Sequence, residues 1–81
     1  MEEHRKRPRH RALKGGKIIF NRRLSVVDCI VRNLSDEGAS LEIGSPVGLP
    51  ETFDLSIPID GLKRSCRVTW KSTTKVGVKF Q

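Results

Sequence analysis

The chain contains few of the residue types that usually carry catalysis or bind metals. Its 81 residues include two histidines, two cysteines, one tryptophan, three phenylalanines and no tyrosine. His4 and His10 lie in a basic N-terminal segment, and their spacing fits neither a metal site nor a nucleophile–base pair. The adjacent carboxylates Asp36 and Glu37 lie in a predicted turn, where acidic side chains usually face solvent. We therefore predict no catalytic residues and no metal, and interpret the protein as a binding module rather than an enzyme.

The two cysteines, Cys29 and Cys66, are far apart, and strand-forming residues flank each of them. Two cysteines alone cannot complete a tetrahedral zinc site. We predict that both are reduced thiols packed in the core, as expected in a reducing compartment.

Long apolar segments are also missing. The apolar runs, such as the one at residues 17–20, are far too short to cross a bilayer. The N-terminus is polar and basic with no apolar stretch behind it, unlike a secretory signal, and it has no apolar residues to insert into a membrane surface. We expect a cytoplasmic protein without a membrane span.

The positive charge is concentrated at one end of the chain. The formal net charge is +7, and residues 1–23 hold nine basic and two acidic residues, which accounts for all of it. Residues 24–81 hold seven of each and are formally neutral. The basic character is therefore a property of the N-terminal segment, not of the folded body.

Six short runs are typical of β-strands, the first by its β-forming residues and the others by side chains that alternate between two faces. They are Lys17–Asn21, Ser25–Asn33, Ala39–Ile43, Phe53–Ile57, Cys66–Lys71 and Val76–Phe80. Turn-forming residues separate them, among which Asp60-Gly61 is a strong hairpin signal. Six antiparallel strands in so short a chain leave edges exposed unless the sheet closes. The sequence therefore predicts an all-β fold, a small six-stranded antiparallel β-barrel.

The predicted barrel covers residues 17–81, and residues 1–16 show neither a helical nor a strand period. Pro8 and the pair Gly15-Gly16 favour a flexible basic N-terminal arm with a glycine joint to the first strand. Alternation predicts the residues that face the barrel interior. They are Ile18, Phe20, Val27, Cys29, Val31, Leu41, Ile43, Phe53, Leu55, Ile57, Cys66, Val68, Trp70, Val76, Val78 and Phe80.

Two polar clusters stand out, the arginine-rich run Arg5–Arg11 and the turn Asn33–Gly38. The arginines can be a solvated tail, an arm that neutralises nucleic-acid phosphates, or a clamp for a guanine nucleotide. An arginine fork bonds guanine or phosphate in bidentate fashion, and its flat face stacks on bases. The turn offers the amide of Asn33, the hydroxyl of Ser35 and, at Gly38, backbone that a ligand can approach.

These residues resemble the two-part signature of PilZ domains, RxxxR followed by (D/N)xSxxG. The first half is Arg5-x-x-x-Arg9, with Pro8 before the second arginine, and the second half is Asn33-x-Ser35-x-x-Gly38. The lead-in at residues 13–18 and the endings at 68–70 and 76–80 are also similar to the family, so the resemblance covers essentially the whole chain. It implies a bacterial receptor for the second messenger cyclic di-GMP.

Under this resemblance, Arg5 and Arg9 hold guanine edges and phosphates, and Asn33, Ser35 and Gly38 meet a guanine base. Arg7-x-x-x-Arg11 also fits the first half, so Arg7 and Arg11 remain an alternative register. The proline before the second arginine favours the pair Arg5 and Arg9.

The chain has no catalytic or DNA-reading module to convey a signal. We therefore expect ligand binding to order the arm, and the ordered surface to act on an unidentified downstream protein. The alternative is a small nucleic-acid-binding β-barrel that uses the basic arm. Against it, the four aromatic side chains are all expected to point inward, which leaves no exposed aromatics for base stacking.

Overall fold

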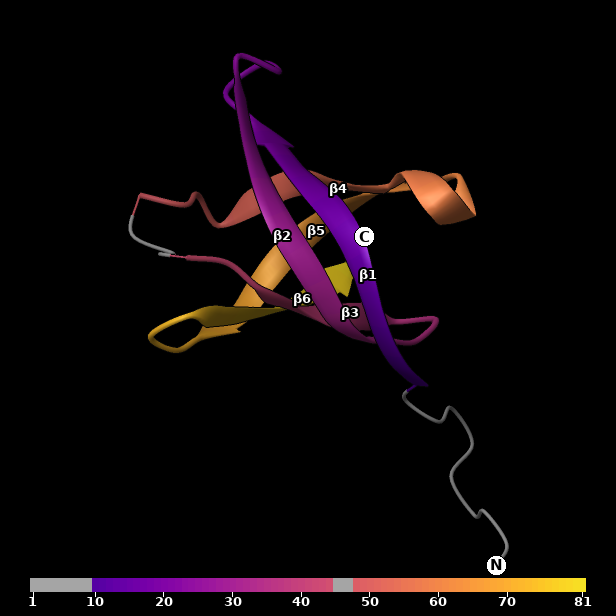
Figure 1. Ribbon diagram of the computed structural model, residues 1–81. Coiled ribbons are helices and arrows are strands. Elements are labelled where there is room, and N and C mark those ends of the chain that lie inside the picture. Colours follow the sequence, from indigo (N-terminus) through magenta and orange to yellow (C-terminus); the bar gives the residue numbers. More distant parts are fainter. Residues whose placement is uncertain (1–9, 45–47) are drawn as a thin grey trace, which may run out of the picture.

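The computed structural model describes residues 10–44 and 48–81, with side chains from Leu13 onward, and it is all-β (Figure 1). The strands are β1 (His10–Phe20), β2 (Ser25–Leu34), β3 (Gly38–Glu42), β4 (Thr52–Ile57), β5 (Leu62–Lys71) and β6 (Lys75–Phe80). A single 3-10 turn, η1 (Pro58–Asp60), joins β4 to β5. None of the described residues belong to a helix long and apolar enough to cross a membrane.

The six strands close into a barrel in the order β1-β2-β3-β6-β5-β4, and every neighbouring pair is antiparallel. β1 and β4 complete the ring where Lys17–Ile19 pairs with Asp54–Ser56. The predicted fold class is therefore confirmed. The predicted turn at Asp60-Gly61 is also present, with Gly61 at φ 65° and its N–H donating to the carbonyl of Pro58 over 3.0 Å.

The barrel is filled by apolar side chains from all six strands and from two residues outside them, Ile43 and Leu49. The buried set is Ile18, Cys29, Val31, Leu41, Ile43, Leu49, Phe53, Leu55, Ile57, Cys66, Val76, Val78 and Phe80. Phe20, Val27 and Val68 pack against this core but are only partly buried. Alternation therefore identified the interior correctly, with one exception described below.

Cys29 and Cys66 are both free and buried, as predicted. Burial, helped by the carboxylate of Asp28 beside Cys29 and of Asp54 beside Cys66, raises the pKa of each thiol to about 11. Both thiols are therefore protonated at neutral pH, and they serve as small apolar core residues.

The first strand begins earlier than predicted, which corrects the expected glycine joint. β1 starts at His10, and the backbones of Gly15 and Gly16 pair with Ile30 and Cys29 of β2. The strand extends this far because β2 provides backbone partners for these residues. Position 16 also has little room for a side chain, since a Cβ on Gly16 would lie 3.1 Å from the sulfur of Cys29. Residues 1–9 of the predicted arm lie outside the described residues.

Trp70 is the exception to the predicted interior. The register of β5 against β6 shifts between Val68, which faces Val78, and Trp70, which faces Gly77. This irregularity places one extra residue in β5, so the alternation of sides reverses after Val68. Trp70 consequently points outward and is 47% exposed, and its predicted inward position was wrong.

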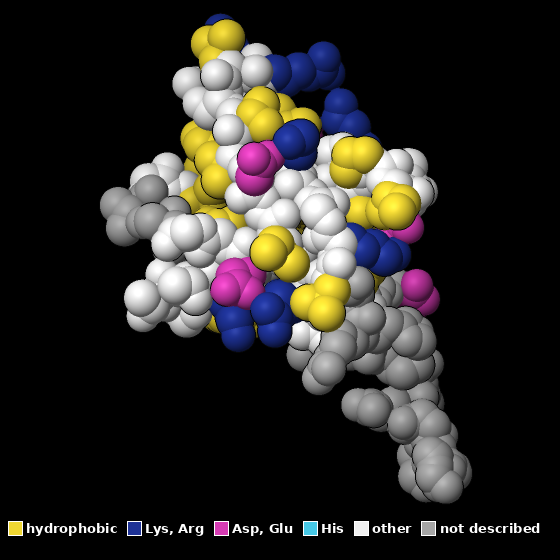
Figure 2. All heavy atoms as spheres, in the orientation of Figure 1, with side chains coloured by type: hydrophobic (Ala, Val, Ile, Leu, Met, Phe, Trp, Pro, Cys, Tyr) yellow, Lys and Arg dark blue, Asp and Glu magenta, His cyan; other side chains and the backbone are white. Residues whose placement is uncertain are grey.

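Charged and apolar side chains are interspersed on the outer surface of β1 and β2, which face the viewer in Figure 2. Lys17 pairs with Asp28 across the two strands at 2.6 Å, and Arg32 of β2 pairs with Glu42 of β3 at 2.8 Å. Such exposed pairs add little stability, about 0–1 kcal/mol each, so the buried core is what holds the barrel together.

Candidate functional site

The turn between β2 and β3 is organised by the hydroxyl of Ser35. Its oxygen accepts hydrogen bonds from the backbone N–H groups of Glu37 (3.2 Å) and Gly38 (3.3 Å). The backbone N–H of Ser35 donates to the carbonyl of Gly38 over 2.9 Å, which closes the turn. The serine therefore holds the shape of the turn in addition to any contact it makes with a ligand.

Asn33 lies next to this turn at the end of β2 and is half-buried. Its amide nitrogen donates to the hydroxyl of Ser40 on β3 over 3.0 Å, which fixes the orientation of the amide. Across β1, the Cα partner of Asn33 is Arg11. The backbone of the arginine-rich segment thus arrives beside the second half of the motif.

The other predicted arginines, Arg5, Arg7 and Arg9, lie outside the described residues, and only the backbone of Arg11 is described. The fold therefore brings together Asn33, Ser35 and Gly38, and it leaves the choice between the two arginine registers as a prediction.

Gly38 has a structural role that the motif alone does not reveal. A Cβ at this position would overlap the carbonyl oxygen of Val78 on β6. Gly38 pairs with Lys79 and its neighbour Ala39 pairs with Val78, so β3 and β6 approach each other closely here. The missing side chain is required by this strand contact, apart from any room it leaves for a base.

A surface cavity of about 290 Å³ opens beside the turn, between the ends of β3, β5 and β6. Its lining residues are Ser35, Glu37, Gly38, Ala39, Ser40, Thr69, Trp70, Gly77, Val78 and Lys79. Two of the three predicted turn residues, Ser35 and Gly38, therefore line the cavity directly. Asn33 supports it from behind through its bond to Ser40.

Trp70 is held in this cavity by a glycine. A Cβ on Gly77 would overlap the indole ring, so the ring lies directly against the backbone of Gly77. The hydroxyl of Thr69, the residue at the register shift, donates to the carbonyl of Gly77 over 3.2 Å. The arrangement presents an aromatic ring beside the Ser35–Gly38 turn, which suits stacking of a planar base.

The cavity carries charges of both signs. Lys79 is exposed on β6 and provides an ammonium group, the kind of partner that phosphate requires. Glu37, in the turn itself, also lines the cavity, and its backbone carbonyl accepts from the N–H of Phe80, the residue after Lys79, over 2.7 Å. Among the side chains that the structure describes, no group of three or more potential ligands could hold a metal ion.

Trp70 and Lys79 were not identified as site residues from the sequence. Strict alternation placed Trp70 inside, because an extra residue in a strand leaves no mark in a hydrophobic pattern. The available signal was Gly77, a glycine between two valines of β6, since such a glycine often makes room for an aromatic side chain of the neighbouring strand.

The family model described as the PilZ domain matches residues 3–81 of the chain, which is essentially its whole length. No curated protein matches the chain.

Proposed function

Because the chain belongs to the PilZ family, whose domains bind cyclic di-GMP, we propose that it is a cyclic di-GMP receptor that holds its ligand at the Trp70 cavity. One observation carries this proposal. The fold brings Ser35 and Gly38 of the motif into one cavity with an exposed tryptophan and a lysine. These groups match the aromatic base, the polar base edge and the phosphates of the ligand.

In this proposal, different residues contact different parts of the ligand. One guanine stacks on Trp70, and its polar edge bonds Ser35 and Asn33, since an amide and a hydroxyl together offer donors and acceptors. Lys79 faces a phosphate. The Ser35 hydroxyl already accepts from the backbone N–H groups of Glu37 and Gly38 and donates to the carbonyl of Gly38 over 3.4 Å, so in this proposal it exchanges one of these bonds for a bond to the guanine.

The size of the cavity explains why the arginines are needed. About 290 Å³ lies at the lower end of the range for small-molecule sites, so it holds one base rather than a whole cyclic dinucleotide. The rest of the ligand extends outward, and Arg5 and Arg9 would cover it with bidentate bonds to guanine and phosphate.

The signal is passed on, in this proposal, when the ligand orders the arm and the combined surface binds a downstream protein in the bacterial cytoplasm. Amide NMR provides the measurement. Residues 4–9 should lose fast internal motion when cyclic di-GMP binds, whereas His10, Arg11 and Lys14, whose backbones already pair with β2, should change little. Residues 4–9 that are equally mobile with and without ligand would contradict this mechanism.

The arginine register can be tested by alanine substitution. Arg9→Ala should weaken cyclic di-GMP binding about tenfold, near the low end for a lost bidentate contact, because neighbouring arginines can replace part of it. Arg11→Ala should have a smaller effect. If Arg7→Ala and Arg11→Ala are instead the damaging pair in a calorimetric titration, the alternative register is correct.

The proposal as a whole is tested by isothermal titration calorimetry with cyclic di-GMP, with GTP as the control. Saturable binding of cyclic di-GMP and none of GTP is the expected result. No heat of binding for cyclic di-GMP, at concentrations where folding is verified by NMR, would refute the proposal.

A nucleic-acid-binding barrel remains the second candidate, and the exposed Trp70 favours it more than the sequence did, since single strands stack on such side chains. Salt separates the two functions. If the protein contacts several phosphates of a nucleic acid, its affinity should fall about a thousandfold between low and moderate salt. Its affinity for a small dianion such as cyclic di-GMP should fall much less.

A further inference from the structure

The β1–β2 hairpin extends beyond the barrel, at the end of β2 opposite to the Ser35–Gly38 turn (Figure 1). β4 pairs with β1 only at Lys17–Ile19, and β3 pairs with β2 only from Ile30 onward. Residues 20–25 therefore form a two-stranded ribbon, and residues 26–28 pair with β1 but not with β3. We call residues 21–26 the hairpin tip.

The hairpin tip exposes apolar and cationic side chains side by side. Leu24 is 81% exposed and Val26 is 55% exposed. Arg22 and Arg23 are exposed as well, and neither forms an ion pair with any side chain that the structure describes. Figure 2 shows basic and hydrophobic groups together at the top of the molecule. The core gains nothing from these residues, which points to an interaction surface.

The backbone of the tip is strained in a way that favours a role for its side chains. Asn21, Arg22 and Arg23 have φ values of 56°, 56° and 72°, and the N–H of Leu24 donates to the carbonyl of Asn21 over 3.0 Å. Asparagine tolerates this left-handed conformation, but arginine adopts it rarely. Two successive arginines at positions better suited to glycine or asparagine suggest that the guanidinium groups are needed there.

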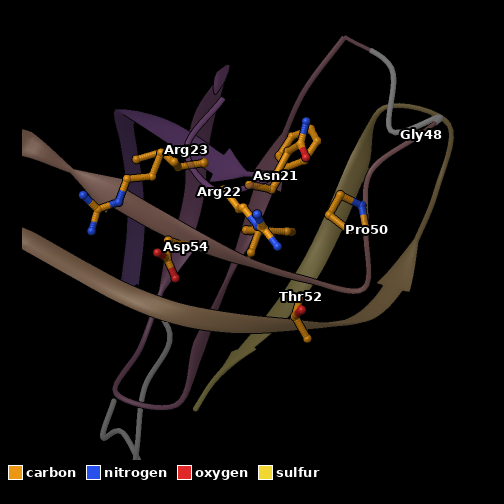
Figure 3. A pocket seen from close by; sticks show the side chains of 10 residues that line it. Asn21, Arg22, Arg23, Gly48, Pro50, Thr52 and Asp54 are labelled. Carbon is orange, nitrogen blue, oxygen red and sulfur yellow. The ribbon is translucent and has the colours of Figure 1, made fainter. Parts of the chain in front are cut away.

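A cavity of about 510 Å³ lies beneath the tip, between it and β4. Phe20, Phe53 and Pro50 give it apolar walls. In Figure 3, the side chain of Arg22 lies among the labelled lining residues, and Arg23 extends to one side of them, above Asp54 of β4. The cavity thus combines an apolar interior with guanidinium groups at its margin.

We propose that the hairpin tip and this cavity form a docking site for an acidic segment of a partner protein. One apolar side chain of the partner enters the cavity, and carboxylates beside it pair with Arg22 and Arg23. Residues 21–26 include no aromatic side chain on which bases could stack, and the exposed Leu24 and Val26 offer apolar contacts that a phosphate backbone does not use. A protein segment therefore fits better than nucleic acid.

The docking site and the Trp70 cavity share no lining residue. Both can therefore be occupied at once. The docking site lies at the end of β2 opposite to the Ser35–Gly38 turn, so its existence does not rest on the proposed function.

The test selects binders to the full chain, without cyclic di-GMP, from a display library of random dodecapeptides. Enriched peptides should carry aspartate or glutamate on both sides of an aromatic or aliphatic residue. Their affinity should fall about tenfold or more in Arg22→Glu and in Arg23→Glu. The matched control is Lys63→Glu, which reverses an exposed charge on β5 and should change affinity less than about twofold.

Arg22→Asn separates binding from folding, since asparagine accommodates the left-handed backbone but lacks the charge. Its melting temperature should stay equal or rise while peptide affinity falls. Enriched peptides without acidic residues, equal binding to Arg22→Glu and Lys63→Glu, or no enrichment would overturn the docking site. So would binding to phosphatidylglycerol vesicles that is lost in Leu24→Ser, in place of peptide binding.

Calorimetry with cyclic di-GMP on the same variants keeps the two proposals apart. The affinity for cyclic di-GMP should be unchanged in Arg22→Glu and Arg23→Glu. Acidic peptides that bind a chain with no cyclic di-GMP affinity would overturn the proposed function and leave the docking site supported.

Discussion

Replacing Trp70 with alanine is expected to weaken cyclic di-GMP binding roughly ten- to a hundredfold, because stacking of a base on an aromatic side chain contributes about 1–3 kcal/mol. The fold should survive, since the side chain is 47% exposed and packs against Gly77 rather than in the core. Trp70 is the single tryptophan of the chain, so its fluorescence in the wild-type protein should also change on titration with the ligand.

The control for this substitution is Trp70→Phe, which keeps a stacking surface and should retain most of the affinity. Circular dichroism of both variants should match the wild type. If Trp70→Ala binds cyclic di-GMP as tightly as Trp70→Phe does, the ligand does not stack at this position, and the placement of the site in the Trp70 cavity is wrong.

Most of the fold followed from the sequence because a period of two is a direct consequence of strand geometry. Leu41, Leu55 and Val76 lie in three strands at positions that the alternation assigns to the interior, and all three are fully buried. The pattern failed where an inserted residue changed the register. Nothing in the residues Val68-Thr69-Trp70 marks a shift, since it depends on how β5 meets β6.

The start of β1 was missed for a different reason. Gly15 and Gly16 read as a joint because glycine is common where a chain bends. In the barrel they are strand residues, because β2 is long enough to give them backbone partners. Whether a Gly-Gly pair belongs to a strand or to a joint depends on the neighbouring strand, and the local sequence contains no information about that pairing.

The site could be predicted in part. The turn residues Asn33, Ser35 and Gly38 form a contiguous motif, and a short motif is readable from the sequence. Trp70 and Lys79 come from β5 and β6, more than thirty positions away along the chain, and join the turn only through strand order. A single sequence contains no direct record of that juxtaposition.

Substitution of Gly38 tests whether this motif residue is required for the fold, for ligand binding or for both. Gly38→Ala should destabilise the protein by about 3 kcal/mol, at the upper end of the cost of overpacking, because the new Cβ overlaps a backbone carbonyl that cannot rotate away. For a domain of this size that corresponds to a melting temperature lower by more than about 10 °C.

The matched control is Gly15→Ala. Gly15 also lies in a strand, but a Cβ there meets nothing within 4 Å, so stability should change by less than about 0.5 kcal/mol. Thermal denaturation of the two variants measures the difference. If Gly38→Ala is as stable as Gly15→Ala yet no longer binds cyclic di-GMP, the glycine serves the ligand alone. If it is destabilised as expected, loss of binding in that variant follows from the opening of the β3–β6 contact, since the same contact positions the turn beside Trp70.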